Sequence, residues 1–474
     1  MLSMRSWWNR SRAVLAAAIC GVALLQGCNS HGERVHVLRQ EFYAGDLATA
    51  ETHIGELLKK PKHDKDVLEL DRASILLTTG RPKEAEKILR EIRDRFDTFE
   101  QKDAGEIALS LLTDDNRRAY AGEDYEKVLI RAFLALSNLM HDGGDATAYS
   151  LQIADKQSQI LERLQTDRDK DETSDKPALP KIPQVALGPY VRAMLAEESR
   201  LDYDDAIRAR TLVCSYEPGF KFGREDLQRA EHSVNAQPGH GVVYVFGLLG
   251  KGPIKIQEYD VPTQAALLVA DQIVSATSKQ SVPPTLAPVP VPKLIRRQNR
   301  IRGLEVVAGS ESRGTTAMLV NVGELAEKHY EATYPKVIAY AVARRVIKKG
   351  VVYAAKEGVQ AQNSPGVDIA MTLAGMAWEA NETADTRCWG LLPDQIQVLR
   401  VELPVGQQSL RLQPIDEYGR FGVAETVQVN VEDGRNTYVL ANFPDGKAIG
   451  RTLVSGQLPA GSADSSGAAE LTLK

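Results

Sequence analysis

The stretch from Thr79 to Ala85, TGRPKEA, indicates how the first half of this 474-residue chain folds. Its glycine ends one apolar-faced helix, and its alanine lies near the start of the next, where a small side chain lets two helices approach closely. The stretch AGDLATA, residues 44–50, has the same glycine and alanine spacing 35 positions earlier. The matched pairs are Gly45 with Ala50 and Gly80 with Ala85. The pattern predicts successive helical hairpins.

This spacing is similar to that of the tetratricopeptide repeat, a two-helix unit of about 34 residues. Two later units look like degenerate copies. One is an apolar-faced helix over residues 125–140, followed by a glycine turn and Ala148, and the other ends at Ala206, with aspartate in place of the glycine. The longer spacings between Ala85, Ala148 and Ala206 imply insertions, such as the charged loop 167–176. We therefore expect a domain of helical repeats over residues 28–217, with repeat signature Gly45, Ala50, Gly80, Ala85, Ala148 and Ala206.

Composition changes after about residue 218, and we expect a mixed α/β region over residues 218–390. Residues 239–256 (GHGVVYVFGLLGKGPIKI) predict a β-hairpin around a glycine turn. Residues 281–292 contain five prolines in twelve positions and must run extended, either as a linker or as a sheet edge. Residues 324–361 predict a long helix, broken or kinked at Pro335.

Alternating apolar residues return near the C-terminus. Runs such as IQVLRVEL (396–403) alternate around Pro-x-Gly and Asp-Gly turns, which predicts a small antiparallel β sandwich over residues 391–454. Residues 455–474 are rich in Gly, Ser and Ala, and we expect a disordered tail there. The predicted fold class is α+β, with helical repeats followed by the mixed region and the sandwich.

The N-terminus has the features of an export signal. Three arginines and no acid precede a 13-residue apolar run, residues 13–25, which is too short to span a bilayer. The run ends in Leu25-Gln26-Gly27-Cys28, which resembles the lipobox of bacterial lipoproteins. The resemblance implies a signal peptide over residues 1–27, cleavage before Cys28 and acylation of that cysteine. The alternative is an ordinary cleaved signal with an incidental cysteine.

Charge and the residue after Cys28 bear on location. The chain has a formal net charge of -5, and loss of three signal arginines would make it about -8, which does not suit a nucleic-acid-binding protein. No second long apolar run follows the signal, so lipid would be the only membrane anchor. Asn29 stands where an inner-membrane retention signal would have aspartate. We therefore expect an outer-membrane lipoprotein facing the periplasm.

Two cysteines, Cys214 and Cys388, remain after the signal and the lipid site. An oxidising periplasm would permit a disulfide between them. Two buried unpaired thiols would fit the sequence equally well, because sequence does not show proximity.

Four segments together resemble one poorly characterised family of bacterial envelope lipoproteins with a tetratricopeptide-like N-terminal half. They are residues 123–128 (EDYEKV), 250–255 (GKGPIK), 341–348 (AVARRVIK) and 384–397, the last with the pattern Asp-x-Arg-x-Trp, Leu-Pro and Ile-Gln. The family implies no catalytic residues. Its members resemble neighbours of lipoprotein activators of penicillin-binding proteins, which is a lead toward cell-wall synthesis.

Asp385, Arg387 and Trp389 are the most specific part of that resemblance. The acid and the arginine could pair beside the tryptophan and fix the joint between the long helix and the first strand of the sandwich. The alternative is a partner-binding hot spot centred on Arg and Trp.

Catalytic and metal-binding patterns are not evident. The eight histidines form no closely spaced pair, and a zinc site at His232 and His240 would lack further ligands. Cys388 has no nearby histidine to activate it. The acid pairs 114–115 and 204–205 fit helix N-terminal caps. We predict no catalytic residue, no metal and no cofactor.

The leading hypothesis is a non-enzymatic lipoprotein that binds an envelope protein or peptide and is held at the membrane by Cys28. The second is an activator of, or an enzyme in, peptidoglycan synthesis. The third is a structural lipoprotein that contacts peptidoglycan or polysaccharide.

Overall fold

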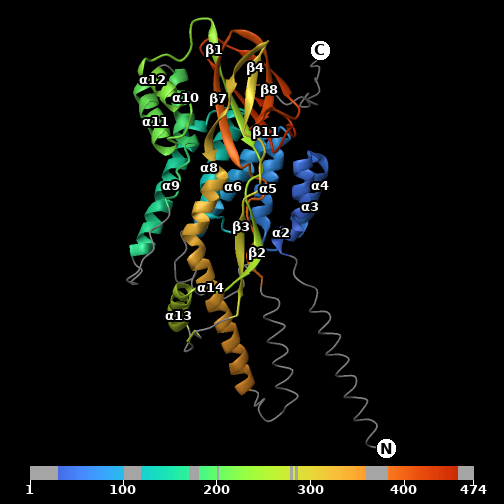
Figure 1. Ribbon diagram of the computed structural model, residues 1–474, viewed down its shortest axis with the longest axis vertical. Coiled ribbons are helices and arrows are strands. Elements are labelled where there is room, and N and C mark those ends of the chain that lie inside the picture. Colours follow the sequence, from blue (N-terminus) through green and yellow to red (C-terminus); the bar gives the residue numbers. More distant parts are fainter. Residues whose placement is uncertain are drawn as a thin grey trace, which may run out of the picture.

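The computed structural model describes residues 30–100, 119–169, 181–199, 202–277, 281–282, 287–358 and 383–456. It has a mixed α+β fold, about 49% helix and 23% strand, with helices N-terminal and sheets C-terminal. The predicted α+β class is confirmed at this level. Figure 1 shows sheets at one end of an elongated molecule, the N-terminal helices in the middle, and a projecting arm at the other end.

Helices fill the first half of the described chain. Each one packs against the next along the sequence, from α3 through α12. Their bounds are α2 His31–Arg34, α3 His36–Ala44, α4 Leu47–Lys59, α5 Lys65–Thr78, α6 Pro82–Glu100, α8 Asp124–Leu139, α9 Ala146–Asp169, α10 Leu187–Ser199, α11 Tyr203–Tyr216 and α12 Gly223–Glu231.

Three alanines of the expected repeat signature occupy one structural position. Gly45 and Gly80 adopt φ angles of 85° and 90°, a left-handed conformation that costs glycine little and ends the preceding helix. Ala50, Ala85 and Ala206 are fully buried. Each is the fourth residue of its helix, so the three alanines occupy equivalent positions.

Ala148 does not fit the signature, because its side chain is exposed. Helix α9 begins three residues after Gly143, whereas α4 and α6 begin two residues after their glycines. The longer turn shifts the helix by one position. The buried fourth position is therefore taken by Tyr149, and the expectation for Ala148 is wrong.

Two sheets face one another across an apolar core. The first has the order β12-β11-β1-β7-β6, and the second has the order β10-β8-β4-β5, with β9 beside β8. Their bounds are β1 His240–Leu249, β4 Gly303–Ala308, β5 Glu311–Thr315, β6 Ala317–Asn321, β7 Gln395–Pro404, β8 Gly406–Asp416, β9 Gly419–Arg420, β10 Glu425–Val431, β11 Asn436–Phe443 and β12 Leu453–Val454.

Strands from residues 391–454 do not form a separate antiparallel sandwich. β1 lies between β7 and β11, and it runs parallel to β11. Strands β4, β5 and β6 also come from the preceding region. Both sheets therefore contain strands from before and after residue 391, so the expected boundary there does not separate two domains.

The predicted hairpin over residues 239–256 is also wrong. β2, Ile254–Asp260, pairs with β3, Val289–Ile295, and not with β1. β1 is apolar on both faces, since Val242, Tyr244 and Phe246 contact the helical core whereas Val243 and Val245 contact the second sheet. An uninterrupted apolar run is typical of such a central strand.

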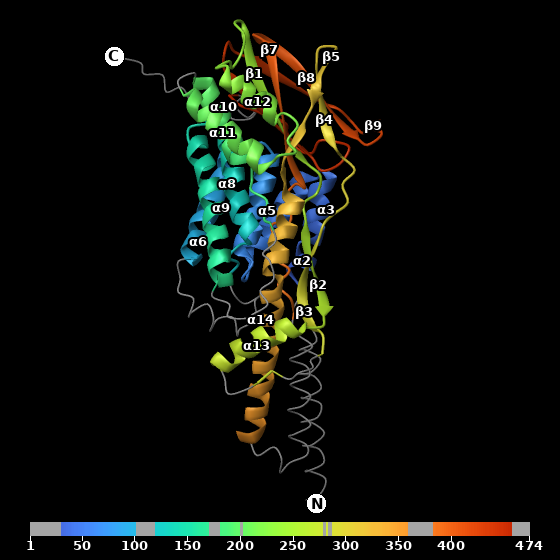
Figure 2. The same cartoon turned by 60° about the vertical axis from the view of Figure 1, so that its left-hand side comes forward.

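The arm contains β2, β3, α13 (Gln264–Thr277) and the far end of α14 (Val322–Gly358). Residues of α13, α14 and β3 form an apolar core of their own, and β2 pairs with β3. Figure 2 shows α13 crossing α14 far from the sheets. Helix α14 continues through Pro335 without a break. The proline-rich segment enters β3, and its last four residues are the first four of that seven-residue strand in a two-stranded ribbon.

Several expectations fall outside the described residues. These are the signal peptide, Cys28, residues 359–361 of the expected long helix, the acid pair 114–115 and the tail from residue 457. Within the described part of the chain, every helix is too short or too polar to cross a membrane.

Candidate functional site

Asp385 and Arg387 form an ion pair just before β7. The guanidinium donates to both carboxylate oxygens at 2.8 and 2.7 Å, and it also donates to the carbonyl of His63 at 3.2 Å. The Arg387 side chain is 3% exposed and lies over the ring of Tyr120. Although burial opposes ionisation, the neighbouring Arg387 charge lowers the pKa of Asp385. The pair fixes the segment against the N-terminal helices.

Trp389 is fully buried at this joint. Its backbone N–H donates to Glu126 of α8 at 2.6 Å, and its indole N–H donates to Ser74 of α5 at 2.9 Å. Its ring centroid lies 5.1 Å from that of Phe133. A side chain without exposed surface cannot anchor a partner in this conformation, so the hot-spot alternative does not fit. The joint seen here lies between the segment before β7 and helices α5 and α8, and the expected joint with the end of the long helix falls on residues outside those described.

Two carboxylates in the joint have unusual environments. Burial raises the pKa of Asp71 to about 7, and one of its oxygens accepts the backbone N–H of Leu391 at 3.1 Å. Burial also raises the pKa of Glu126, with a further contribution from the Glu123 charge. These groups hold the chain in place and line no described pocket.

Cys214 and Cys388 are free thiols and are not bridged. Cys388 lies in the buried joint, where it accepts from the guanidinium of Arg39 at 3.8 Å. Cys214 lies on α11 and faces Gly223 at the start of α12. The disulfide alternative is therefore wrong in this structure, because the two sulfurs sit in different packing environments.

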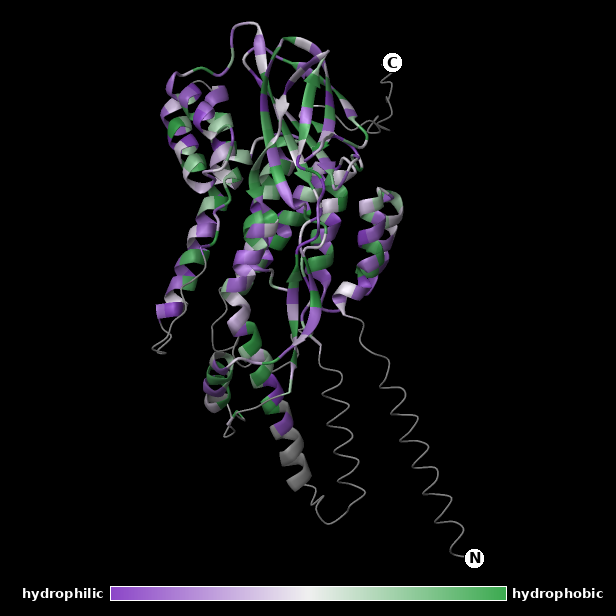
Figure 3. Cartoon of the chain, viewed as in Figure 1, coloured by the Kyte–Doolittle hydropathy of each residue, from purple (hydrophilic) through white to green (hydrophobic). Residues whose placement is uncertain are grey.

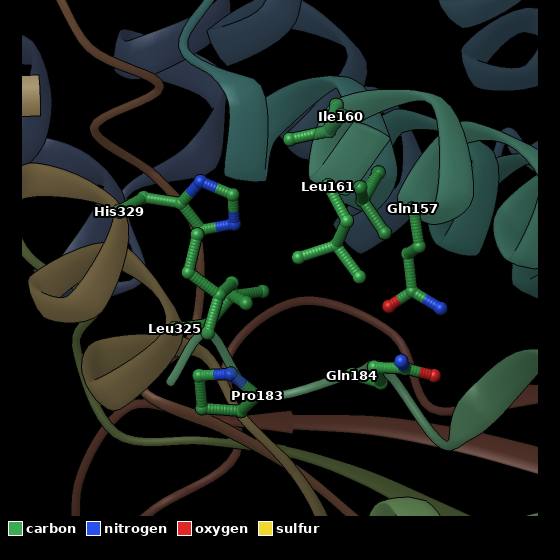
Figure 4. Close-up of a pocket in the computed structure, with 9 residues that line it drawn as sticks. Gln157, Ile160, Leu161, Pro183, Gln184, Leu325 and His329 are labelled. Carbon is green, nitrogen blue, oxygen red and sulfur yellow. The ribbon is translucent and has the colours of Figure 1, made fainter. Parts of the chain in front are cut away.

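A narrow cavity, which we call the His329 niche, lies between α8, α9 and α14. It is lined by Val128, Gln157, Ile160, Leu161, Ile182, Pro183, Gln184, Leu325 and His329. Figure 4 shows His329 on α14 facing Leu161 and Gln157 across the niche. The volume open to a water centre is about 10 Å³, which is room for about one water molecule.

His329 is the titratable group of the niche. It is 5% exposed, and its Nδ1 has no hydrogen-bond partner among the described residues. Burial lowers the pKa of His329 to about 4, although the Asp124 and Glu123 charges oppose the shift. The imidazole is therefore neutral at pH 7. Gln157 also lines the niche, and its side-chain oxygen accepts a hydrogen bond from the backbone N–H of Val185. The niche therefore has polar groups in a mainly apolar lining.

A wider depression, the acidic groove, adjoins the niche and shares Pro183, Gln184 and Leu325 with it. Its other walls come from the end of α11, the turn after it, β6 and the start of α14, with Tyr216, Glu217, Pro218, Leu319, Val320, Asn321 and Glu324. The volume open to water centres is about 200 Å³. Small-molecule sites usually enclose about 300–1,000 Å³, so the groove suits one or two side chains of a partner better than a cofactor.

Two carboxylates give the groove its charge. Glu324 accepts from the Asn321 side-chain amide at 3.0 Å, and the Glu324 backbone N–H donates to Asn321 Oδ1, also at 3.0 Å, which fixes the first turn of α14. Burial raises the pKa of Glu217, and the Glu324 charge raises it further. A cation placed in the groove would relieve the repulsion between the two acids.

Sequence patterns did not identify His329, Gln157, Glu217 or Glu324. They come from three segments separated by up to about 170 positions, and none sits in a recognisable motif. The residues described by the structure contain no group of three His, Cys, Asp or Glu side chains placed to hold a metal ion.

Comparison with known proteins adds no relative. The chain has no significant match to a family model, to a curated protein or to a solved structure.

Proposed function

We propose that this protein is a lipid-anchored scaffold of the bacterial cell envelope that binds a segment of a partner protein and catalyses no reaction. The observation that carries the proposal is the acidic groove, where Glu217 and Glu324 stand beside an apolar wall at the junction of the helices and the first sheet. Carboxylates that converge beside an apolar lining in one depression are typical of a binding site, although Leu319, Val320 and Leu325 are themselves 1%, 4% and 3% exposed.

The groove's chemistry defines the kind of segment it would take. A Lys or Arg side chain would lie between the two carboxylates, and a neighbouring apolar side chain would pack on Leu319, Val320 and Leu325. The raised pKa of Glu217 reflects burial next to a like charge, which a partner cation would offset. A basic and apolar peptide segment is therefore the expected ligand.

The N-terminal helices support this role as a rigid framework. We propose that the pairs α3–α4, α5–α6, α8–α9 and α10–α11 are tetratricopeptide-like units. The left-handed Gly45 and Gly80 and the equivalent buried Ala50, Ala85 and Ala206 support that interpretation. We also propose that the two facing sheets form a sandwich assembled from strands before and after α14.

The proposed cellular location depends on the sequence alone. Cys28 at the end of a short apolar run would carry the lipid, and Asn29 favours the outer membrane, with the protein facing the periplasm. Cell fractionation tests this part: replacing Cys28 by Ser should move the protein from the membrane to the soluble fraction. Mass spectrometry of the mature N-terminal peptide should show the acyl chains, and an unacylated N-terminus would remove the anchor.

A photo-crosslinking residue at Tyr216 tests the groove in living cells. We expect it to capture a discrete partner, whereas the same residue at Tyr418, which is 86% exposed and far from the groove, should not capture that partner. A synthetic peptide copied from the crosslinked segment should then bind the purified protein.

Charge variants make the test specific. The double variant Glu217→Gln and Glu324→Gln should weaken peptide binding by roughly ten-fold or more, because both carboxylates face the proposed cation. The matched control, Glu225→Gln and Glu231→Gln on the exposed side of α12, removes the same charge and should leave binding unchanged. Equal loss in both double variants would mean nonspecific attraction and would refute the groove as the site.

A further inference from the structure

The arm leaves large apolar side chains uncovered on one helix. α13 packs against α14 with its small residues Ala266 and Ala270 and with Val274, all of which are buried. Leu268 on the same helix is 62% exposed, and Leu267, Val269 and Ile273 are only partly buried. A surface helix of a soluble protein normally turns its large apolar residues inward. α13 turns Leu268 outward and covers Leu267, Val269 and Ile273 only in part.

The ribbon beside α13 also exposes apolar side chains, on both of its faces. Ile256 and Tyr259 on β2 are 43% and 61% exposed, and Val261 just after it is 61% exposed. With Leu268, four exposed large apolar side chains fall within thirteen residues. In a soluble protein such residues are usually scattered singly, and a concentration of them marks an interaction surface. Figure 3 shows apolar and polar colours mixed on α13 and on the neighbouring strands of the arm.

The start of the described chain lies at the root of this arm. The backbone N–H of Gly32 donates to Thr386 Oγ1 at 3.3 Å, and Gly32 also lies next to the carbonyl of Lys255 in β2. Cys28 precedes helix α2 by only two residues. Since an extended chain spans at most about 3.6 Å per residue, a lipid on Cys28 would hold the root of the arm within about 15 Å of the bilayer surface.

The arm also differs in charge from the rest of the protein. Residues 253–277, 287–295 and 336–358 contain eight Lys or Arg and four Asp or Glu, although the whole chain has a net charge of -5. Lys255, Arg344 and Arg345 are buried, which leaves five Lys against four Asp or Glu, so apolar contact and not charge would hold the arm at the lipid. Tyrosine is also favoured at the level of the headgroups.

We infer that the arm lies against the surface of the bilayer that holds Cys28, with Leu268, Tyr259 and Val261 entering the headgroup region. The inference rests on the lipid anchor proposed above. The tether brings the arm to the membrane, the exposed apolar side chains bind there, and the sheets and the acidic groove face away from the lipid. The protein is thereby held in one orientation, and not as a freely rotating body on a flexible tether.

Fluorescence quenching by spin-labelled lipids tests this orientation. The lipidated full-length protein, in a Cys214→Ser background, carries an environment-sensitive label at Leu268→Cys or, as the control, at Tyr418→Cys. Cys388 is buried and should not react. On vesicles that contain phosphatidylglycerol, we expect quenching at position 268 to exceed that at position 418 at least three-fold. Equal, weak quenching at both positions while the protein floats with the vesicles would overturn the inference.

A second form of the protein separates the arm from the anchor. A chain that begins at residue 29 with an N-terminal histidine tag can be held on vesicles containing nickel-chelating lipid. Preferential quenching at position 268 should persist. If it persists but cells yield no acylated Cys28, the lipid-binding surface stands and the proposed anchor fails. If it is lost while acylation is found, the anchor stands and the arm inference fails.

Discussion

The backbone N–H of Trp389 donates to Glu126 Oε1 at 2.6 Å, although 263 positions separate the two residues in the sequence. The indole of the same tryptophan reaches Ser74, on a different helix. The segment that leads into β7 is therefore held between α5 and α8, and the first sheet is fixed to the helices at this joint. The relative position of the groove's walls depends on it.

Removal of the Trp389 side chain should strongly destabilise the protein. Trp389→Ala should lower the free energy of unfolding by about 3–5 kcal/mol, because it leaves a cavity in a fully buried site. Trp389→Phe should cost about 1–2 kcal/mol, since it mainly removes the hydrogen bond to Ser74. Urea unfolding followed by circular dichroism measures both. Tyr418→Ala, at an exposed position, should change stability by less than about 0.5 kcal/mol, and a similar loss there would contradict the argument.

Asp71 should make the protein less stable as pH rises from about 4 to about 7. Burial raises the pKa of the folded Asp71 carboxyl to about 7, so over this range the folded state holds a proton that the unfolded state has lost. Asp71→Asn resembles the protonated acid. Its melting temperature relative to the parent protein should therefore increase from pH 4.5 to pH 7.5 and change little above that.

The control for Asp71 is Asp204→Asn, which removes a carboxylate from an exposed position. Thermal melts at several pH values provide the comparison. An advantage of Asp71→Asn that was constant across the range, or that shrank toward high pH, would contradict the expected protonation of Asp71.

His329 should have the opposite effect at lower pH. Burial lowers the pKa of the folded His329 imidazole to about 4, whereas the unfolded residue titrates near its ordinary value of 6.5. Between those values the unfolded state binds the extra proton, so stability falls as pH decreases from about 6.5 to about 4. The loss at pH 5 should be on the order of 2 kcal/mol.

His329→Gln checks this by keeping a polar group in the niche without the titration. The difference in melting temperature between the parent and the variant should shift in favour of the variant as pH falls from 7 to 5. NMR titration of the His329 ring should show a neutral imidazole at pH 6, and a charged ring there would contradict the environment described for the niche.

Two glycines should respond oppositely to alanine. Gly80→Ala should cost about 1–2 kcal/mol, since φ is +90° and the new methyl group would lie 3.1 Å from the Arg451 side chain. Gly55→Ala should stabilise the protein by about 0.5–1 kcal/mol, because Gly55 lies within α4 and no atom stands within 4 Å of the added carbon. Denaturant melts of the two variants measure the difference, and equal signs would contradict the assigned conformations.

Much of the helical half could be predicted from the sequence. Gly45 and Gly80 mark helix ends because glycine adopts the left-handed conformation at little cost, and Ala50 and Ala85 then fall on the packed face. The prediction failed at Ala148, where a turn longer by one residue rotates the helix and buries Tyr149 instead. One extra residue in a loop is a small change in the sequence, but it changes which side chains of the following helix face the core.

Strand pairing was harder to predict, because it joins distant segments. β1 was expected to pair with the strand that follows it, yet its partners are β7 and β11, more than 140 positions away. Its unbroken apolar run was the available signal of a central strand. The candidate site depends on the same long-range assembly, since Glu217 and Glu324 meet only when α11 and α14 are in place.

The sequence by itself determined the α+β class and the helical hairpins, because these depend on local periodicity and turn residues. Only the tertiary structure decided that Cys214 and Cys388 are apart, that Trp389 is enclosed, and where the acidic groove and the apolar arm lie. Those features arise from contacts between residues far apart in the chain, and local pattern carries no information about which distant segments will bury one another.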